Sequence, residues 1–345
     1  MTTLIETTKR QSRLDIRGLV SLLLVLAVIT APLWAGRAEL RLLGEFLSFL
    51  ALAVLWNLLA GYAGLLSVGQ QAFVGFGGYS LFVLCTHAGL SPFLALPLTI
   101  IAAGALAAVF APLLFRLDGA YFAIGTWVAA ETVMLVFAMI PALGGGAGMS
   151  IAAPLVRAIA SDKDVREAII FLLVAGLSLA TLFGAYGLLL SRAGLALMAV
   201  RDNRLAAASL GIDIWRTRFV TYVIVAALSG GLGAVIFLQK LRISPSAAFS
   251  LNDWTVMVIF AVVIGGIGRL EGALVGATLY FLMREMMADL GTVYLIVLGS
   301  LAILIMLFSR KGLWGLIEAR FGWSLMPTER EPQMTIAAQQ TQCHK

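Results

Sequence analysis

Apolar runs of nearly bilayer-spanning length follow one another along almost the whole chain. A helix needs about 20 residues to cross ~30 Å of hydrocarbon, and several of these runs are shorter or broken by glycine. We therefore expect an all-α polytopic membrane protein with about ten transmembrane helices, in the range of eight to ten. The expected spans are residues 18–36, 46–60, 70–87, 92–114, 119–140, 168–190, 218–238, 254–267, 270–288 and 292–309.

Composition excludes several functional classes. Hydrophobic residues make up 61% of the chain and charged residues 12%, far from the composition of a soluble domain. The net charge of +6 does not indicate nucleic-acid binding, because the basic residues fall in loops between apolar runs. The two cysteines and two histidines form no metal-binding or catalytic pattern. The phosphate-binding pattern G-x-x-x-x-G-K-[ST] does not occur, so we expect no ATP site, no bound cofactor and no enzyme activity in this chain.

The distribution of basic residues predicts the topology. With the N-terminus in the cytoplasm, 16 of the 24 Lys and Arg residues lie in inside segments and 8 in outside segments. Lys and Arg favour cytoplasmic loops, so we expect both termini inside. This divides the chain into a cytoplasmic segment 1–17, a transmembrane domain 18–309 with a cytoplasmic loop 191–217, and a polar cytoplasmic tail 310–345. The long polar lead before Leu19 favours a retained first helix over a cleaved signal peptide.

The cytoplasmic loop between the sixth and seventh expected spans contains a short helix pattern. Asp202 is a suitable N-cap, residues 203–210 are mostly good helix formers, and Gly211 suits the left-handed position after a helix. Arg201 and Arg204 flank a small-residue face of alanines at positions 206–208. Such a helix either docks into a partner and transmits its motion or belongs to a solvated loop, and the residues alone favour neither interpretation.

Polar residues gather where the second expected span ends and the third begins. They are Asn57, Ser67, Gln70 and Gln71, interspersed with glycines that suggest a broken or re-entrant segment. In hydrocarbon, such groups need either interhelical hydrogen bonds or a water-lined cavity, and both interpretations stay open. Glu131 lies near the middle of its span, where a carboxyl group is costly, so it should face a cavity or a partner. It either contacts substrate or fixes packing.

Glycines also mark the ninth expected span. Gly268, Gly272 and Gly276 recur every four residues and are expected to line one helix face for close packing. Arg269 and Glu271 mark the short cytoplasmic turn before this span. The segment 268–280 is weakly similar to 64–79, since both are glycine-punctuated starts of a span. This similarity reflects either an internal repeat or chance spacing. The long outside stretch 141–167 is expected to be a loop followed by a short surface helix.

Four segments in matching order resemble one known family. The stretch VRDNRLAAASLGI is followed, after a span, by SPSAAFSLNDWTVMVIFAVVIGGIGRLEGALVGA, and GYAGLLSVGQQAFVGFGGY and GAYFAIGTWVAAE precede them. Together they resemble the permease subunit of branched-chain amino acid ATP-binding-cassette (ABC) importers, the LivM-like subunit. The resemblance covers about residues 50–310. It departs from the common Glu-Ala-Ala signature of importer loops, because Leu205 occupies the Glu position.

The resemblance implies an inner-membrane permease driven by separate ATPase subunits. It also implies a second homologous permease and a periplasmic solute-binding protein as partners. In this family the loop helix is the coupling helix, which sits in a cleft of the ATPase. The residues carried over are Arg201, Asp202, Asn203, Ala206, Ala207, Leu210 and Gly211. Branched-chain amino acids are the expected cargo, with other amino acids, amides or urea as alternatives. An ion-gradient-driven transporter using Glu131, and more remotely a membrane enzyme, are the competing functions.

Overall fold

The computed structural model describes residues 22–151, 154, 157, 159–287, 293–309 and 312–321. The expected cytoplasmic segment 1–17 and the tail beyond residue 321 lie outside these residues. The helices, in chain order, are Leu22–Trp34, α2 (Arg37–Asn57), α3 (Gln70–Thr86), α4 (Pro92–Leu114), α5 (Ala120–Met139), α7 (Lys163–Leu190), α8 (Arg192–Asp202), α9 (Arg204–Ser209), α10 (Ile214–Lys240), α11 (Pro245–Ala248), α12 (Met257–Gly265), α13 (Leu270–Met286), α14 (Val293–Phe308) and α15 (Gly312–Phe321). Short elements complete the list: π-helical turns Leu58–Tyr62 and Asn252–Val256, 3-10 turns Pro141–Leu143 and Gly145–Ala147, and strands β1 (Met149–Ser150) and β2 (Arg242–Ile243).

The all-α polytopic membrane fold is confirmed. Six helical stretches in the described part of the chain are long and apolar enough to cross a membrane. They are Arg37–Tyr62, Pro92–Leu114, Ala120–Met139, Lys163–Leu190, Ile214–Lys240 and Pro245–Gly265. Each of the ten expected spans overlaps a helix. The number of crossings, eight to ten, and the side on which the termini lie remain predictions.

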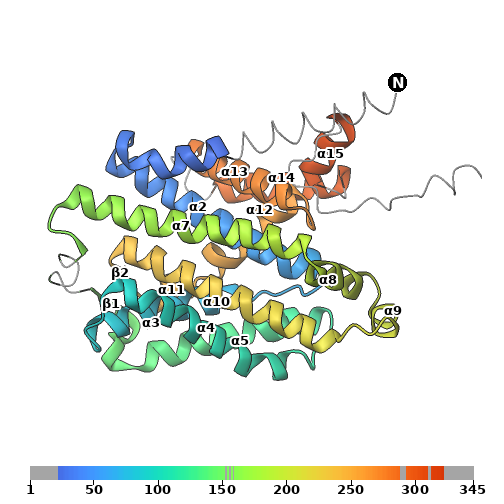
Figure 1. Cartoon of the computed structure of the whole chain (residues 1–345), viewed down its shortest axis with the longest axis horizontal. Coiled ribbons are helices and arrows are strands. Elements are labelled where there is room, and N and C mark those ends of the chain that lie inside the picture. Colours follow the sequence, from blue (N-terminus) through green and yellow to red (C-terminus); the bar gives the residue numbers. More distant parts are fainter. Residues whose placement is uncertain are drawn as a thin grey trace, which may run out of the picture.

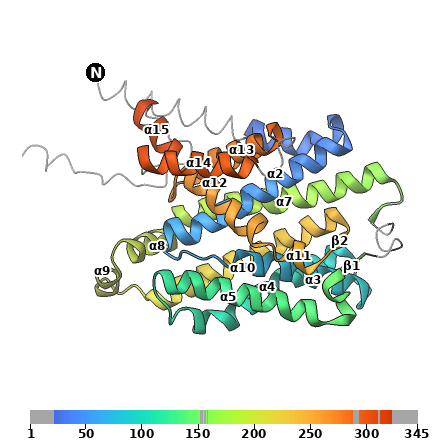
Figure 2. The same ribbon diagram turned by 180° about the vertical axis from the view of Figure 1, so that it is seen from behind.

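The helices run roughly alongside one another in a bundle whose two ends differ (Figure 1). The loop helices α8 and α9 project from one end, and the two-stranded antiparallel sheet of β1 and β2 lies at the other end (Figures 1 and 2). In its most apolar window α2, with its π-helical turn, is 78% buried, whereas α5 is 22% buried. The centre of the bundle is thus α2, and α5 lies at its edge.

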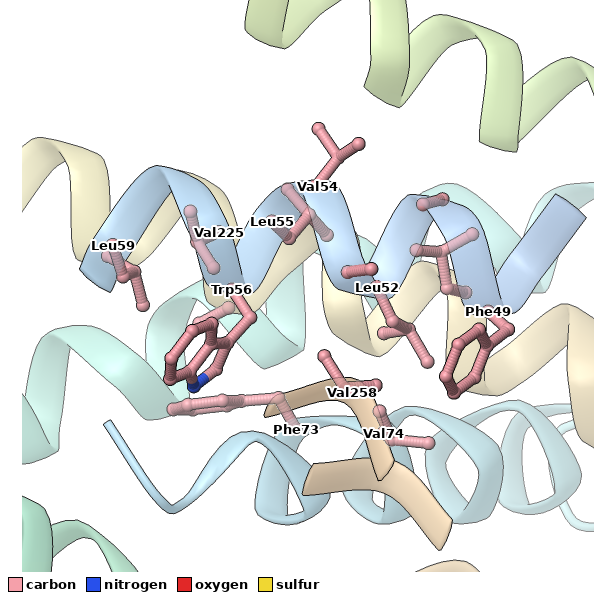
Figure 3. Close-up of a cluster of buried hydrophobic side chains, with 14 of the residues drawn as sticks. Phe49, Leu52, Val54, Leu55, Trp56, Leu59, Phe73, Val74, Val225 and Val258 are labelled. Atoms are coloured by element: carbon pink, nitrogen blue, oxygen red, sulfur yellow. The ribbon is translucent and has the colours of Figure 1, made fainter. Parts of the chain in front are cut away.

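The core forms where α2 meets α3, α10 and α12. Figure 3 shows Phe49, Leu52 and Trp56 of α2 directed toward Phe73 and Val74 of α3, with Val258 of α12 beside them. These side chains are all buried. Figure 3 also shows the Trp56 indole next to the Phe73 ring.

The stretch 141–167 differs from the expectation. The mixed-charge run at residues 162–167 is not a separate surface helix but the start of the 28-residue helix α7. Asp162 caps this helix by accepting a hydrogen bond from the Asp164 N–H. Ion pairs then hold the start of α7 to the start of α2: Arg37 pairs with Asp164, and Arg41 with Glu167. The charged residues of this run thus belong to α7, and two of them pair with arginines of the neighbouring helix α2.

The packing role expected for three glycines is correct for two of them. Gly272 and Gly276 lie on α13, and a Cβ at either position would collide with the backbone of α12. Gly268 does not share that face, because it precedes α13 and has a left-handed φ of 80°. The four-residue spacing begins before the first residue of α13, so the prediction that Gly268 lies on this helix face is wrong.

Candidate functional site

The chain breaks between α2 and α3, as the polar and glycine-rich sequence predicted. The helix α2 ends in a π-helical turn, and residues 63–69 then run without regular structure to α3. The four predicted polar residues, Asn57, Ser67, Gln70 and Gln71, are all buried. Non-helical backbone at membrane depth requires such enclosure.

Asn57 joins this break to the turn between α12 and α13. Its Nδ2 donates to the Arg269 carbonyl oxygen at 2.8 Å, and its Oδ1 accepts from the Gly268 N–H at 2.8 Å. The side chain therefore satisfies two backbone groups of a segment more than 200 residues away in sequence. Both functional groups of Asn57 are used for this contact, which is a structural one.

Ser67 and Gln70 lie beside a small cavity. The cavity is about the size of one water molecule and is lined by both residues, by Ser229 of α10 and by apolar side chains including Trp56 and Phe73. The Gln70 Nε2 donates to the Leu52 carbonyl at 3.1 Å and lies 3.4 Å from Ser229 Oγ. Within the described part of the chain, Gln70 Oε1 has no hydrogen-bond partner.

Gln71 contacts a different element. Its backbone N–H donates to Thr255 Oγ1 at 3.2 Å, and the same hydroxyl donates to Gln71 Oε1 at 2.5 Å. Thr255 belongs to the π-helical turn before α12. The four residues of the polar string thus contact four different elements, and of the four only Ser67 and Gln70 line the cavity.

Glu131 lies apart from this group, near the middle of α5. Its side chain is partly exposed, and Trp127 Nε1 of the same helix donates to Glu131 Oε1 at 3.2 Å. The side chains around it on α5, including Val128 and Leu135, are exposed. The carboxyl group therefore lies on the outward side of the helix that is least buried among the six long apolar ones.

The loop 191–217 contains the predicted short helix, but with a different N-cap. Asp202 is the last residue of α8, and Asn203 caps α9 by accepting from the Ala206 N–H at 3.1 Å. Asp202 instead accepts from Arg201 Nε at 2.8 Å. Gly211 has the predicted left-handed conformation, with a φ of 81°. The helix is therefore six residues long, shorter than the expected eight.

The exposed side of α9 includes two of the three alanines, Ala206 and Ala208. Ala207 is buried, while Leu205 and Leu210 are 84% and 78% exposed. Arg204 pairs with Asp118 in the turn between α4 and α5 at 2.6 Å. This hydrogen bond and the Arg204 charge hold the pKa of the Asp118 carboxyl below its usual value. The pair links α9 to the turn between α4 and α5, while Leu205 in α9 and Leu210 just after it remain exposed.

Three polar partners were missed from the sequence. Thr126 of α5 accepts from the Val68 N–H at 2.9 Å, and Thr255 and Ser229 bond to Gln71 and Gln70. Each is a single hydroxyl group in an apolar run. Only the three-dimensional arrangement distinguishes them from hydroxyls bonded within their own helix, such as Thr278.

Comparison with known proteins identifies the family. Residues 40–308 match the family model described as branched-chain amino acid transport system / permease component. The chain belongs to this family. The permease is 28% identical over 313 residues to the high-affinity branched-chain amino acid transport system permease protein LivM of Salmonella typhimurium and, equally, of Escherichia coli, covering 84% of this chain and 73% of each relative.

A shorter match is to a relative with a different name. The permease is 35% identical over 98 residues to the probable LivH permease protein of Methanocaldococcus jannaschii, covering 28% of this chain and 29% of the relative. No solved structure matches the permease significantly. Family membership and the apolar helices confirm the resemblance seen in the sequence and the localisation as a multi-pass inner-membrane protein.

Proposed function

We propose that this permease is the transmembrane subunit of an ABC importer that moves branched-chain amino acids into the cell. Separate ATPase subunits bind and hydrolyse ATP, and the permease itself carries no ATP site or cofactor. The family description and the LivM relatives support branched-chain amino acids as the cargo. Other amino acids, amides and urea are the alternatives that a competition assay separates.

The exposed face of α9 carries this proposal. A capped helix projects from the bundle end, anchored by Arg204 and Asp118, and presents Leu205 and Leu210 to solvent. Trp215, at the start of α10, is also exposed. Exposed large apolar side chains on a loop at the membrane surface favour docking into an apolar cleft of another protein. That face is the proposed contact with the ATPase.

The position of β1 and β2 indicates the end of the bundle at which the proposed importer would receive its cargo. They lie opposite α9, so a solute-binding protein would deliver its cargo there (Figure 1). The helix α15 is paired with the turn before α13 through Arg269 and Glu318, next to Asn57 and Arg201. This supports placing the C-terminus on the same, cytoplasmic side as α9.

A second homologous permease is the proposed partner within the membrane. A carboxyl group at mid-span is costly when it faces lipid. Glu131 is partly exposed on α5, where most side chains around it are also exposed. Covering this face with a second permease would enclose Glu131 in protein or in a water-lined path between the two subunits. Ser67 and Gln70, which line the buried cavity inside the permease, are the proposed polar contacts of the translocation path, with Asn57 and Gln71 supporting them.

The test is binding of the cognate ATPase to purified permease. The double variant Leu205→Ala, Leu210→Ala removes the exposed apolar face but keeps a good helix former within α9. Each truncated leucine should weaken ATPase affinity by about tenfold. Leu195→Ala, an exposed leucine on α8, is the matched control and should bind as wild type. Wild-type permease that binds no ATPase would refute the proposal.

A further inference from the structure

Arg201 does not lie on the exposed face of α9, although the sequence grouped it with the ATPase-contacting residues. It occupies the last turn of α8, and its Nη1 donates to the carbonyl oxygen of Gly61 at 2.7 Å. Gly61 belongs to the π-helical turn that ends α2. The guanidinium group thus reaches the break between α2 and α3 through Nη1, although about a third of the side chain stays exposed.

Two left-handed glycines lie along the Arg201 side chain. A Cβ built on Gly64, whose φ is 66°, would stand 3.4 Å from Arg201 Cγ. A Cβ built on Gly268, whose φ is 80°, would stand 3.6 Å from Arg201 Nη1. These glycines open the two segments whose sequences are weakly similar, 64–79 and 268–280. One arginine therefore lies between the start of the segment leading to α3 and the start of the segment leading to α13.

The two glycine turns also contact each other directly. A Cβ on Gly61 would stand 2.5 Å from the Gly268 nitrogen and 2.7 Å from its Cα, so the two backbones touch. Asn57 bonds to both Gly268 and Arg269, and Arg269 pairs with Glu318 of α15. Of these contacts, the Arg269–Glu318 pair is charge-assisted, and such hydrogen bonds are stronger than neutral ones. The loop, α2, the α12–α13 turn and α15 are joined at one point.

We propose that Arg201 is a positioning residue that transmits movement of the coupling loop to both broken-helix turns at once. This inference rests on the proposed importer function. Arg201 suits the task because its planar head donates from Nε to Asp202 and from Nη1 to Gly61, while its stem packs along Gly64. π-helical turns occur frequently at functional sites. Displacing α9 pulls on the Gly61 carbonyl and, through Asn57 and Gly268, on α13.

A further hydrogen bond connects the π-helical turn to the polar residues beside the cavity. Trp56, next to Asn57, donates from Nε1 to the Ser67 carbonyl at 2.7 Å. Ser67, Gln70 and Trp56 line the same cavity. A shift of the π-helical turn therefore moves residues of the proposed path, while α9 itself stays in contact with its partner.

The experiment measures ATPase binding, ATP hydrolysis and leucine uptake by the complete importer in proteoliposomes. Arg201→Met removes the guanidinium group but keeps an apolar stem. We expect ATPase binding to be retained and the leucine moved per ATP to fall about tenfold, the size of one hydrogen bond to a charged group. Arg201→Lys keeps one donor for Gly61 and should restore part of the coupling. Arg192→Met, an exposed arginine on α8, is the control and should behave as wild type.

The outcomes separate this inference from the proposed function. Arg201→Met that loses the ATPase would make Arg201 a direct partner contact and overturn the inference. Full coupling in Arg201→Met, with ATPase bound to the wild type, would overturn the inference and leave the importer function standing. A wild-type permease that binds no ATPase refutes both.

A second measurement does not depend on the partners. Amide hydrogen exchange of the full chain in nanodiscs should become faster in both 58–69 and 264–272 when Arg201 is changed to Lys or Met. The exchange of α7 should not change. Faster exchange in only one of the two turns would contradict a link from Arg201 to both. If Arg201→Met folds poorly, Arg201→Lys still allows the same measurement.

Discussion

The Thr255 hydroxyl group makes two hydrogen bonds to Gln71, one to its backbone N–H at 3.2 Å and one to its side-chain Oε1 at 2.5 Å. Gln71 is in the first turn of α3, where backbone N–H groups have no partner within the helix. Thr255 is fully buried in the π-helical turn before α12. It therefore caps α3 from an element more than 180 residues away.

Thr255→Val should destabilise the permease. Valine has nearly the same shape but leaves the Gln71 N–H and Oε1 without this partner, at a cost of about 1–2 kcal/mol. Thermal unfolding in detergent measures the change. Thr278→Val is the control, because the Thr278 hydroxyl is exposed and bonds only to its own helix. Equal stability of the two variants would contradict the capping role.

The helices α3 and α10 should not tolerate a methyl group between them. A Cβ on Gly77 would collide with the backbone of Gly230 on α10. Overpacking of this kind costs about 1–3 kcal/mol or more, so Gly77→Ala should lower the unfolding temperature and the yield of folded protein. Gly184→Ala on α7 meets no atom within 4 Å. It should be neutral or slightly stabilising, because alanine favours a helix. A harmless Gly77→Ala would show that the two backbones can separate.

Most of the fold could be predicted because each helix has its own local sequence pattern. Apolar runs located the helices, and the break between α2 and α3 showed in its glycines and amides. The ends of helices were less predictable. Arg37 and Asp164 lie in the first turns of α2 and α7, and they pair across 127 positions of sequence. No local pattern reveals such a partner.

The sequence predicted which residues belong to the candidate site, but not how they are arranged in space. Asp202 and Asn203 are both good N-caps, and only the backbone conformation selects Asn203. Leu205 stood out in the sequence only as a departure from a family signature, yet it is the most exposed residue of α9 among the large apolar ones. The direction of Arg201 depends on where Gly61 lies in space, which spacing alone does not give.

The N-cap of α9 gives a prediction that separates the two neighbouring residues. Asn203→Ala removes the acceptor of the Ala206 N–H and should cost about 0.5–2 kcal/mol of helix stability. ATPase affinity should fall, because the two leucines depend on an ordered α9. Asp202→Ala removes only a contact with Arg201 and should bind the ATPase more tightly than Asn203→Ala. The opposite ranking, measured by pull-down of the cognate ATPase, would return the cap to Asp202.

The anchoring of α9 by Arg204 and Asp118 should not depend on pH in the physiological range. The pKa of Asp118 is lowered below 3.8 by its hydrogen bond to Arg204 and by the Arg204 charge. A carboxylate with a lowered pKa contributes stability above its unfolded pKa and loses it as the pH falls through its folded pKa. The contribution is therefore constant from pH 5 to 9 and disappears only below about pH 4.

Amide exchange of residues 204–211, corrected for the intrinsic effect of pH, measures this. Asp118→Asn should reproduce at pH 7 the loosening that acid causes in the wild type. The change should be small because the Asp118 side chain is 72% exposed. A midpoint between pH 5 and 8 would point to a group other than Asp118.

Glu131 gives the prediction that distinguishes an ATP-driven importer from a gradient-driven transporter. Glu131→Gln keeps an oxygen acceptor for Trp127 Nε1 but cannot exchange a proton. In an importer driven by ATPase subunits, proteoliposomes holding the complete complex should therefore keep most of their ATP-dependent leucine uptake. Trp127→Phe, which removes the donor from the other side, is the matched variant and should have a similarly small effect. If Glu131→Gln abolishes uptake, and the wild-type permease alone accumulates leucine under a pH gradient without ATP, then Glu131 carries a proton. The proposal of an ATP-driven importer would then be wrong.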